Sequence, residues 1–443
     1  MTHSATQHST TQKAEGEETA GEAMHALARR LFPICRSITG AGLRRTLGIV
    51  QEHIPLEIRE VPTGTRVFDW TVPKEWTIRD AYVKDEDGQR VVDFQESNLH
   101  VVNYSAPVDA HMSLEELRPH LHTRPDRPNW VPYRTAYYDD EAWGFCLRHR
   151  TLETLEEGTY EVCIDASLED GALSYGECVL PGETDEEVLL SCHACHPSMA
   201  NDNLSGIALA TYLAEHLADR STRYTYRVVF VPATIGALTW LDHNEEPLSR
   251  IKHGLVIACV GDPGPFVYKQ SRSGDAPIDR AAAHVLRTMD ATTEVRSFTP
   301  VGNDERQYGA PGFDLPVGRL TRTPHGEYPE YHTSADDLSL ITPEALGATF
   351  RCYRRVIEVL EQNDTYLNTN PKGEPQLGRR GLYQALGGSD LPDKEQALLW
   401  TLNLCDGTHS LLDIAERSEL PFAAIEHAAR LLREHDLLTA GPS

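Results

Sequence analysis

The sequence lacks a long hydrophobic run. Among its 443 residues there is no apolar segment of the kind that opens a secreted protein and none long enough to cross a membrane. We therefore expect a cytoplasmic protein with no membrane partner. The 9 cysteines are odd in number and widely spread, without the spacing of a disulfide framework. They predict free thiols in a reducing compartment.

Positive charge is also scarce. The chain has 41 Lys and Arg against 67 Asp and Glu, a net charge of -26. Because phosphate groups are bound by clustered Lys and Arg, this balance argues against a nucleic-acid partner. A hydrophobic content of 40% and a charged content of 24% are typical of a soluble globular protein. We leave open whether the chain forms a homo-oligomer.

The pattern of apolar residues divides the chain into parts of different character. A polar start predicts a disordered tail, short alternating strands predict a small inserted β domain, and alternating helices and strands predict an α/β sandwich with a mainly parallel sheet. Gly158–Ile164 and Gly171–Leu180 read as an antiparallel pair within this sandwich. The expected parts are the tail (1–20), the α/β domain (21–54 and 131–363), the inserted β domain (55–130), a linker (364–394) and a C-terminal helical domain (395–443).

The C-terminal domain resembles a winged helix. Two predicted helices joined by a short turn are followed by Asp436, Leu437 and Leu438. Winged helices often bind DNA, but acidic residues outnumber basic ones in this part of the chain. We therefore favour a packing or protein-contact role over DNA binding.

The stretch from Val188 to Gly206 organises the α/β domain. It starts as a buried strand, continues through His193 and His196, and enters a helix near Asp202. Ligands of open α/β sheets bind at the carboxyl ends of strands, and imidazole with carboxylate is a ligand set that suits zinc. A single strand-end histidine or an Asp that caps a helix is the more ordinary structural explanation. Two histidines and an Asp in one short segment favour a metal site.

The two cysteines of this stretch allow other interpretations of the site. Cys192 and Cys195 could form a redox pair or part of a zinc knuckle. No second Cys pair follows at zinc-finger spacing. We therefore expect both thiols to pack in the core or to support a ligand.

Three later clusters carry residues of matching chemistry. Asp262 follows a predicted buried strand, Asp304 and Glu305 lie in a polar loop, and His332 lies in the sequence Glu-Tyr-His-Thr-Ser-Ala-Asp-Asp. Each has an ordinary explanation as a turn or loop residue. Because they follow successive strands of one predicted sheet, we expect them to meet at the same edge.

In this order of motifs the chain resembles the zinc aminopeptidase family, which includes leucyl aminopeptidases, glutamate carboxypeptidases and glutaminyl cyclases. The resemblance covers about residues 21–438. It is most specific in Cys-His-Pro-Ser-Met-Ala-Asn-Asp-Asn-Leu-Ser-Gly and in the segment around His332. It implies an aminopeptidase-like α/β/α sandwich with an inserted β domain and a C-terminal winged helix. It also implies a zinc site whose ligands are His193, Asp202, Asp262 and His332, with His196 as a substitute for His193 or a supporting residue.

The chain departs from the family at two places. The family's His-x-Asp becomes His193-Ala194-Cys195, and its adjacent glutamates, one a base and one a ligand, become Ala233 and Thr234. We therefore expect one zinc ion rather than two. The proton acceptor would then be Glu305 or Asp304. The alternative explanation for these two carboxylates is a surface ion pair with Arg306.

The expected activity is that of a zinc-dependent hydrolase of the aminopeptidase type, with a small peptide or amide as substrate. Arg306 and Tyr331 are the expected substrate-binding residues. Two alternatives stay open: a single-zinc cyclase or acyl transferase of the glutaminyl cyclase type, and a binding protein without catalytic activity.

Overall fold

The structure is a computed structural model that describes residues 19–289, 291–382 and 393–441. Most of the predicted tail, residues 1–18, lies outside this range, and residues 19–31 form the first helix. The chain divides into two compact units. One comprises Met1–Gly274 with Arg296–Arg351, and the other comprises Asp275–Val295 with Cys352–Ser443. In the described residues no helix is both long and apolar enough to cross a membrane.

A large mixed sheet forms the centre of the first unit. Its middle strands β12, β11, β13 and β16 are parallel, and β1, β10 and β14 pair antiparallel toward its edges. The prediction of a mainly parallel sheet in an α/β fold is confirmed. The strands of this sheet that belong to the first unit lie in the order β1 (Glu57–Pro62), β10 (Ala172–Leu180), β12 (Thr225–Val231), β11 (Glu187–His193), β13 (Ile251–Ile257), β16 (Val317–Thr321) and β14 (Phe266–Lys269).

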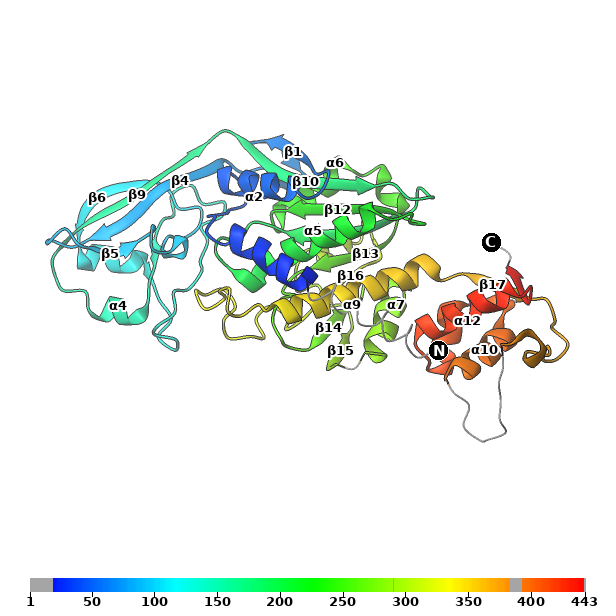
Figure 1. Cartoon of the computed structure of the whole chain (residues 1–443). Helices are drawn as coiled ribbons and strands as arrows, with labels where there is room; N and C mark the ends of the chain where they lie inside the picture. The colour runs from blue at the N-terminus through cyan, green and yellow to red at the C-terminus, as the bar shows by residue number, and fades with distance from the viewer. Residues whose placement is uncertain (1–18, 290, 383–392, 442–443) are drawn as a thin grey trace. The chain divides into compact units, whose positions relative to one another are not determined.

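Helices cover both faces of this sheet. The chain leaves β11 through α5 (Ser205–Ala218) to reach β12 on one side, then returns through α6 (Ile235–His243) to β13 on the other side. Crossover connections between parallel strands are right-handed. The connection through α5 and the connection through α6 run in opposite directions across the sheet, so the two helices lie on opposite faces. Figure 1 shows α5 on the near face, with α2 (Ala41–Gln51) beside it.

This change of face marks one place at the edge of the sheet. Chains that leave neighbouring strands toward opposite faces separate at the carboxyl ends of those strands, and ligands of α/β proteins bind there. In this protein that place lies beyond the ends of β11 and β12, at His193 and Val231. The fold therefore places the histidine-rich segment where a ligand site is expected.

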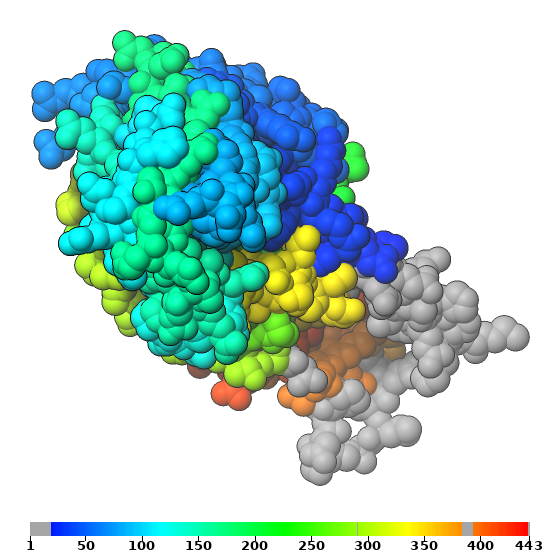
Figure 2. All heavy atoms as spheres, turned by 90° about the vertical axis from the view of Figure 1, so that its left-hand side faces the viewer, coloured from blue at the N-terminus to red at the C-terminus, as the bar shows by residue number. Residues whose placement is uncertain are grey.

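A second sheet forms the inserted β module. Its order is β5-β4-β9-β6, and all of its pairs are antiparallel. The module is the light blue to green part on the left of Figure 1, and it is the part that faces the viewer in Figure 2. The strands are β4 (Glu75–Lys84), β5 (Arg90–Asp93), β6 (Val108–Ser113) and β9 (Thr159–Glu169).

The boundaries of this module differ from the predicted 55–130. Strand β1 belongs to the large sheet, and β9 lies in the module although it comes much later in the chain. The predicted antiparallel pair of Gly158–Ile164 with Gly171–Leu180 is therefore wrong. In Figure 1, β9 and β10 follow one another along a single ribbon from one sheet to the other.

Burial explains why β9 and β10 belong to different sheets. Strand β9 alternates between buried and accessible residues, which suits a sheet with one solvated face. Strand β10 is buried along almost its whole length, which suits a sheet covered on both faces. The smaller elements around these strands are β2 (Arg66–Val67), β3 (Trp70–Thr71), η1 (Asn98–His100), α3 (Leu114–Leu117), η2 (Arg118–His120), β7 (Leu121–His122), β8 (Phe145–Cys146) and α4 (His149–Glu153).

The remaining elements of the first unit connect the strands of the large sheet. They are η3 (Ala200–Leu204), η4 (Pro247–Arg250) and α8 (Glu305–Tyr308). The boundary between the two units lies within α9 (Pro343–Gln362).

The second unit contains the predicted winged helix. Helices α10 (Asp393–Leu404), α11 (Leu411–Ser418) and α12 (Phe422–Glu434) accompany a sheet of order β18-β17-β19. The expected linker 364–394 is wrong at its start, because β17 (Thr365–Asn368) pairs with β18 (Asp406–Ser410) and β19 (Leu438–Ala440). Residues 383–392 lie outside the described part. Further elements of this unit or at its boundary are α7 (Pro277–Arg287), β15 (Thr293–Arg296) and η5 (Gly378–Arg380).

Candidate metal centre

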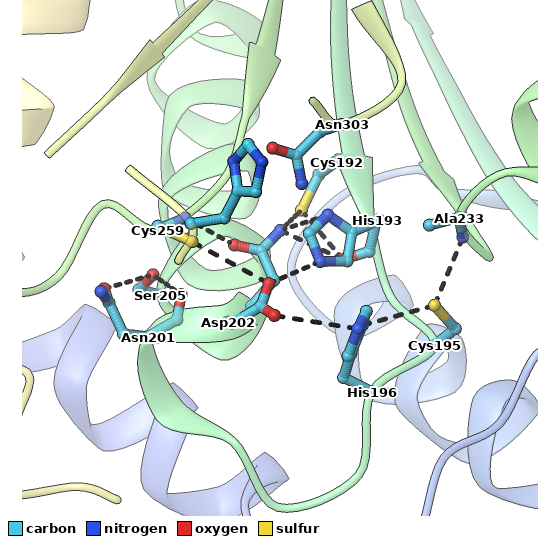
Figure 3. Close-up of polar contacts among 12 residues, drawn as sticks. Cys192, His193, Cys195, His196, Asn201, Asp202, Ser205, Ala233, Cys259 and Asn303 are labelled. Carbon is cyan, nitrogen blue, oxygen red and sulfur yellow. Dashed lines mark hydrogen bonds and ion pairs between the residues drawn. The ribbon is translucent and has the colours of Figure 1, made fainter. Parts of the chain in front are cut away.

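Three imidazole rings converge on the carboxylate of Asp202. The Nε2 atom of His193 lies 2.9 Å from Oδ1 of Asp202, and Nε2 of His332 lies 3.0 Å from Oδ2. Nε2 of His196 lies 3.8 Å from Oδ2. Figure 3 shows His193 and His196 pointing toward Asp202 from the end of β11 and the loop that follows. The predicted meeting of His193, Asp202 and His332 therefore occurs in the folded chain.

The position of Asp202 also decides between a ligand and a helix cap. Helix α5 begins at Ser205, and its N-cap residue Leu204 makes no capping contact through its side chain. Asp202 lies within the turn η3, where its dihedral angles are not helical and its peptide bond to Asn203 is cis. Its carboxylate faces the imidazoles, so it does not serve as an N-cap.

A second carboxylate holds this turn in place. The side chain of Asp336 is fully buried and accepts hydrogen bonds from the backbone N–H of Asn201 at 2.6 Å and of Asp202 at 3.0 Å. It also accepts one from the hydroxyl of Tyr328 at 3.3 Å. Burial raises the pKa of Asp336 to about 8, while the backbone donors act in the opposite direction. Asp336 thus fixes the backbone that carries Asp202.

The protonation of the group follows from burial and from charge. Burial lowers the pKa of His196 to about 3, against the effect of the Asp202 charge. Burial also lowers the pKa of His193, but the hydrogen bond and the charge of Asp202 outweigh it, and the pKa is raised overall. The three histidines hold the pKa of Asp202 well below its usual value, against the effect of burial. The carboxylate is therefore ionised and ready to bind a cation.

These donors fit a zinc ion. One ligand atom each from His193, His196 and Asp202 lies within 4.8 Å of the other two. Imidazole nitrogen and carboxylate oxygen are the donors that zinc takes in catalytic sites, which use three protein ligands and keep one position open. His193 and Asp202 are almost fully buried, so the arrangement is held rigidly. His196, which the sequence leaves as a substitute or a supporting residue, belongs to this group beside His193.

Asp262 has different neighbours from those predicted for a metal ligand. Its Oδ2 atom accepts hydrogen bonds from the hydroxyl of Thr323 at 2.5 Å and from the N–H of Gly264 at 2.8 Å. Its Oδ1 atom accepts from the backbone N–H of Thr323 and from the side chain of Asn201, both at 3.2 Å. Four donors therefore occupy both oxygens, and Asp262 shapes a turn outside the group on Asp202.

The positions that lack the family's glutamates lie next to the histidine loop. The backbone N–H of Ala233 contacts the sulfur of Cys195 at 3.3 Å, and this sulfur lies 3.5 Å from Nδ1 of His196 (Figure 3). Cys195 thus orients the ring of His196 from behind, in agreement with the expected supporting role. Neither Ala233 nor Thr234 offers a carboxylate to a metal or a proton.

The two acidic candidates Asp304 and Glu305 have opposite environments. Glu305 is fully buried and forms two ion pairs, one with Lys269 at 2.8 Å and one with Arg319 at 3.6 Å. Asp304 is 3% exposed, and its carboxylate has no hydrogen-bond or ion-pair partner among the described residues. Burial raises the pKa of Asp304 to about 6, and the charge of His193 partly offsets this effect. Asp304 is thus free to exchange a proton, whereas Glu305 balances buried cations.

The two expected substrate-binding residues have different neighbours. The ring of Tyr331 stacks on that of His332, with centroids 3.9 Å apart. Arg306 is an accessible residue of α8, and its guanidinium lies 3.4 Å from the hydroxyl of Thr234. Tyr331 therefore adjoins the metal ligands directly. Arg306 adjoins the end of β12.

Two residues of this region are not identified by the sequence reasoning. Asp336 belongs to the motif that contains His332, but its role depends on contacts with a turn more than a hundred residues earlier. Cys259 follows β13 and lies beside Asp202, where the sequence predicts Asp262. In the sequence, the two adjacent acidic residues that follow His332 were the feature that could have pointed to Asp336. No feature of the sequence pointed to Cys259.

A family model described as a domain of unknown function, DUF4910, matches residues 25–363. The chain belongs to the DUF4910 family. A second model, described as a winged helix-turn-helix, matches residues 364–440, in agreement with the predicted C-terminal domain. The chain is 52% identical over 422 residues to a Clostridium acetobutylicum protein, covering 95% of this chain and 96% of that one. That relative is provisionally named a polysaccharide biosynthesis protein with an aminopeptidase-like domain.

Solved structures agree with the predicted fold. A crystal structure from C. acetobutylicum, provisionally described as a peptidase, has a TM-score of 0.92 at 49% identity and covers 97% of this chain and 99% of its own. A zinc aminopeptidase from Bacillus subtilis has a TM-score of 0.58 at 10% identity, over 78% of this chain and 94% of its own. A Shewanella amazonensis peptidase of the M28 type has a TM-score of 0.54 at 13% identity, over 79% of this chain and 97% of its own. The predicted likeness of this DUF4910 protein to the zinc aminopeptidases is thus confirmed for the fold.

Proposed function

We propose that this DUF4910 protein is a zinc-dependent hydrolase of the aminopeptidase type that acts on a small peptide or amide. The proposal depends on one observation, the convergence of imidazole nitrogens on the buried carboxylate of Asp202 at the carboxyl end of β11. A buried carboxylate with several histidines around it is costly to form unless a cation or a proton is shared among them. The fold shared with a zinc aminopeptidase supports zinc as that cation.

His193, His196 and Asp202 would hold the zinc ion. When bound, zinc lowers the pKa of a water ligand to about 7 and polarises a carbonyl group. The rigid, buried histidine and carboxylate keep the donors in place, and three protein ligands leave a position open. His332 holds the second oxygen of Asp202 and, with Tyr331 stacked against it, borders the space for a substrate.

Asp304 is the proposed proton acceptor. Its carboxylate is buried, unpaired within the described residues and close enough to His193 for their charges to interact. Glu305 is unsuitable because its charge is needed by Lys269 and Arg319. A positioned base contributes roughly 10²–10⁴-fold to a rate. Arg306 and Tyr331 would contact polar groups of the substrate.

The metal is tested first. Purified protein should contain zinc, and the double variant His193→Ala with Asp202→Ala should not, as measured by inductively coupled plasma mass spectrometry. Asp262→Asn is the matched control, because Asp262 lies outside the group and its loss should leave the zinc content unchanged. A wild-type protein without zinc, or a double variant with the same content, would overturn the proposal.

Activity is tested with aminoacyl anilides, dipeptides and acyl amides. Hydrolysis should stop with a chelator and return with zinc. The product mass separates the alternatives, since hydrolysis adds water and cyclisation loses ammonia or water. If no substrate of the panel is converted by zinc-loaded protein, the binding-protein hypothesis is favoured instead.

The base is tested by two neighbouring substitutions. Asp304→Asn should lower kcat by roughly 10²–10⁴-fold with unchanged zinc content and stability. Glu305→Gln should mainly lower stability, because it leaves Lys269 and Arg319 without a buried counter-charge. The reverse pattern would assign the base to Glu305.

A further inference from the structure

A buried arginine lies behind two polar side chains close to the candidate metal centre. Arg319 is 4% exposed, and its Nη1 atom donates to Oδ1 of Asn303 at 2.7 Å and to Nδ1 of His325 at 2.9 Å. Asn303 and His325 are both half-buried, so a ligand can reach each of them. Within the described part of the chain, Nδ2 of Asn303 and Nε2 of His325 have no hydrogen-bond partner.

The arginine fixes which atoms of these two side chains face away from it. A guanidinium has hydrogen-bond donors and no acceptor, so the atoms that contact Arg319 must be acceptors. The amide of Asn303 therefore directs its NH₂ group away from Arg319. In the neutral ring of His325, Nδ1 accepts and the proton is on Nε2. Burial and the charge of Arg319 lower the pKa of His325, which favours this neutral ring.

Both donors belong to the surroundings of the candidate metal centre. Asn303 directly precedes Asp304, whose charge acts on His193, and Figure 3 shows Asn303 above His193. The ring of His325 lies 6.1 Å from that of Tyr331, the residue that adjoins the metal ligands. A ligand held by these donors would therefore lie next to the zinc ion.

The ion cluster behind the donors has more positive than negative charge. Arg319 and Lys269 share the single carboxylate of Glu305, at 3.6 and 2.8 Å. The Nε atom of Arg319 is buried and has no hydrogen-bond partner among the described residues. A buried charge without a counter-charge is costly, so an anion that approaches this cluster is stabilised by it.

Gly302 allows the loop that carries Asn303 to pack directly on this cluster. A Cβ atom at Gly302 would come within 2.1 Å of Oε1 of Glu305 and within 2.8 Å of Nζ of Lys269. The carbonyl of the preceding residue, Val301, accepts a hydrogen bond from the same Nζ at 2.7 Å. The ion cluster therefore sets the position of the loop, and with it the position of Asn303.

We propose that Asn303 and His325 bind a carboxylate group of the substrate, with the charge of Arg319 behind them. Two donors match the two oxygens of a carboxylate, and one negative charge balances the excess charge of the cluster. A phosphate group has three acceptor oxygens and carries more charge, so two donors would leave it incompletely bound. The inference rests on the proposed hydrolase and names its substrate class, a small peptide or amide with an acidic group.

Binding is tested without catalysis, by isothermal titration calorimetry of the full-length protein. The probes are N-acetylglycine, which has a free carboxylate, N-acetylglycinamide, which is similar in shape and uncharged, and inorganic phosphate. The acid should bind roughly 10-fold or more tightly than the amide, the effect of one hydrogen bond to a charged group. Failure of the acid to bind, equal affinity for acid and amide, or tighter binding of phosphate than of the acid would overturn the carboxylate assignment.

Two substitutions identify the donors. Asn303→Ala and His325→Phe should each weaken binding of the acid by roughly 10–150-fold and leave binding of the amide unchanged. His325→Gln keeps an acceptor for Arg319 and a donor for the ligand, so it should restore most of the affinity. Asn244→Ala and His149→Phe are the matched controls, because these half-buried residues lie outside the cluster and should not affect either probe.

The zinc content and the melting temperature of each variant are measured beside its affinity. A folded Asn303→Ala or His325→Phe protein with wild-type zinc content and wild-type affinity for the acid would overturn the proposed site. Weaker binding in a control variant would overturn it as well.

Activity separates this inference from the proposed function. With peptides offered as free acids and as neutral amides, Asn303→Ala should raise KM for the acids and leave KM for the neutral forms unchanged. A protein that binds the acid as expected but hydrolyses nothing would refute the hydrolase and keep the carboxylate site. A protein that hydrolyses acid and neutral forms equally, in the wild type and in Asn303→Ala, would refute the site alone.

Discussion

The contact between Asp336 and the turn that carries Asp202 allows a quantitative prediction. Asp336 accepts two backbone N–H groups, one on each carboxylate oxygen, and has no exposed surface. Asp336→Asn keeps the size of the side chain but replaces one acceptor oxygen with an NH₂ donor. One backbone N–H of Asn201 or Asp202 then faces another donor and loses its partner. The turn should move, and the carboxylate of Asp202 with it.

The size of the effect follows from the bond that is lost. A buried N–H that is left without an acceptor costs about 1–3 kcal/mol. At about 1.4 kcal/mol per factor of ten, this cost would weaken zinc binding by roughly 5–150-fold. This range agrees with the roughly 10–100-fold cost of removing a residue that orients a metal ligand.

The assay is a zinc titration in competition with a chromophoric chelator. Asp337→Asn is the matched control, since among the residues that the structure describes the carboxylate of Asp337 accepts hydrogen bonds from Ser339 of its own turn alone. Asp337→Asn should bind zinc as the wild type does. If Asp336→Asn also retains wild-type affinity while its unfolding is unchanged, the turn does not depend on Asp336 and the reasoning is refuted.

Other predictions concern stability. Arg227→Met should lower the free energy of unfolding in urea by about 3–5 kcal/mol, because it leaves the buried carboxylates of Glu187 and Glu177 without their partner; a loss below about 1 kcal/mol would contradict this. Burial lowers the pKa of His253 from 6.5 to about 4. The unfolded chain therefore binds a proton at this residue before the folded protein does, and the free energy of unfolding falls as the pH drops from 6.5 to 4. The loss from this one residue is up to about 3 kcal/mol. His253→Phe should therefore flatten the fall of stability between pH 6.5 and 4, and an unchanged slope would reject the shift. Ser410→Ala removes the capping box of α11 and should lower the melting temperature of the winged helix, at a cost of about 0.5–2 kcal/mol; an unchanged melting temperature would show that the cap is dispensable.

Much of the fold is predictable because its signals are local. The apolar run before His193 and the helical spacing after Leu204 lie in short stretches of sequence, and both elements form nearly where they are expected. The order of strands and helices then gives the α/β class. The same reasoning fails for Gly158–Ile164 and Gly171–Leu180, because adjacency in sequence suggests a pair that burial divides between two sheets.

By itself the sequence determined which residues could bind a metal and at which end of the strands they would lie. It identified His193, Asp202 and His332, since strand ends of a parallel sheet share one edge. Only the tertiary structure decided which of the other candidates face Asp202. It brought His196 and Cys259 to that carboxylate, surrounded Asp262 with hydrogen-bond donors and paired Glu305 with Lys269. The reason is physical: the direction of a side chain in a loop depends on hydrogen bonds to residues far away in the chain, and no local pattern of residues records them.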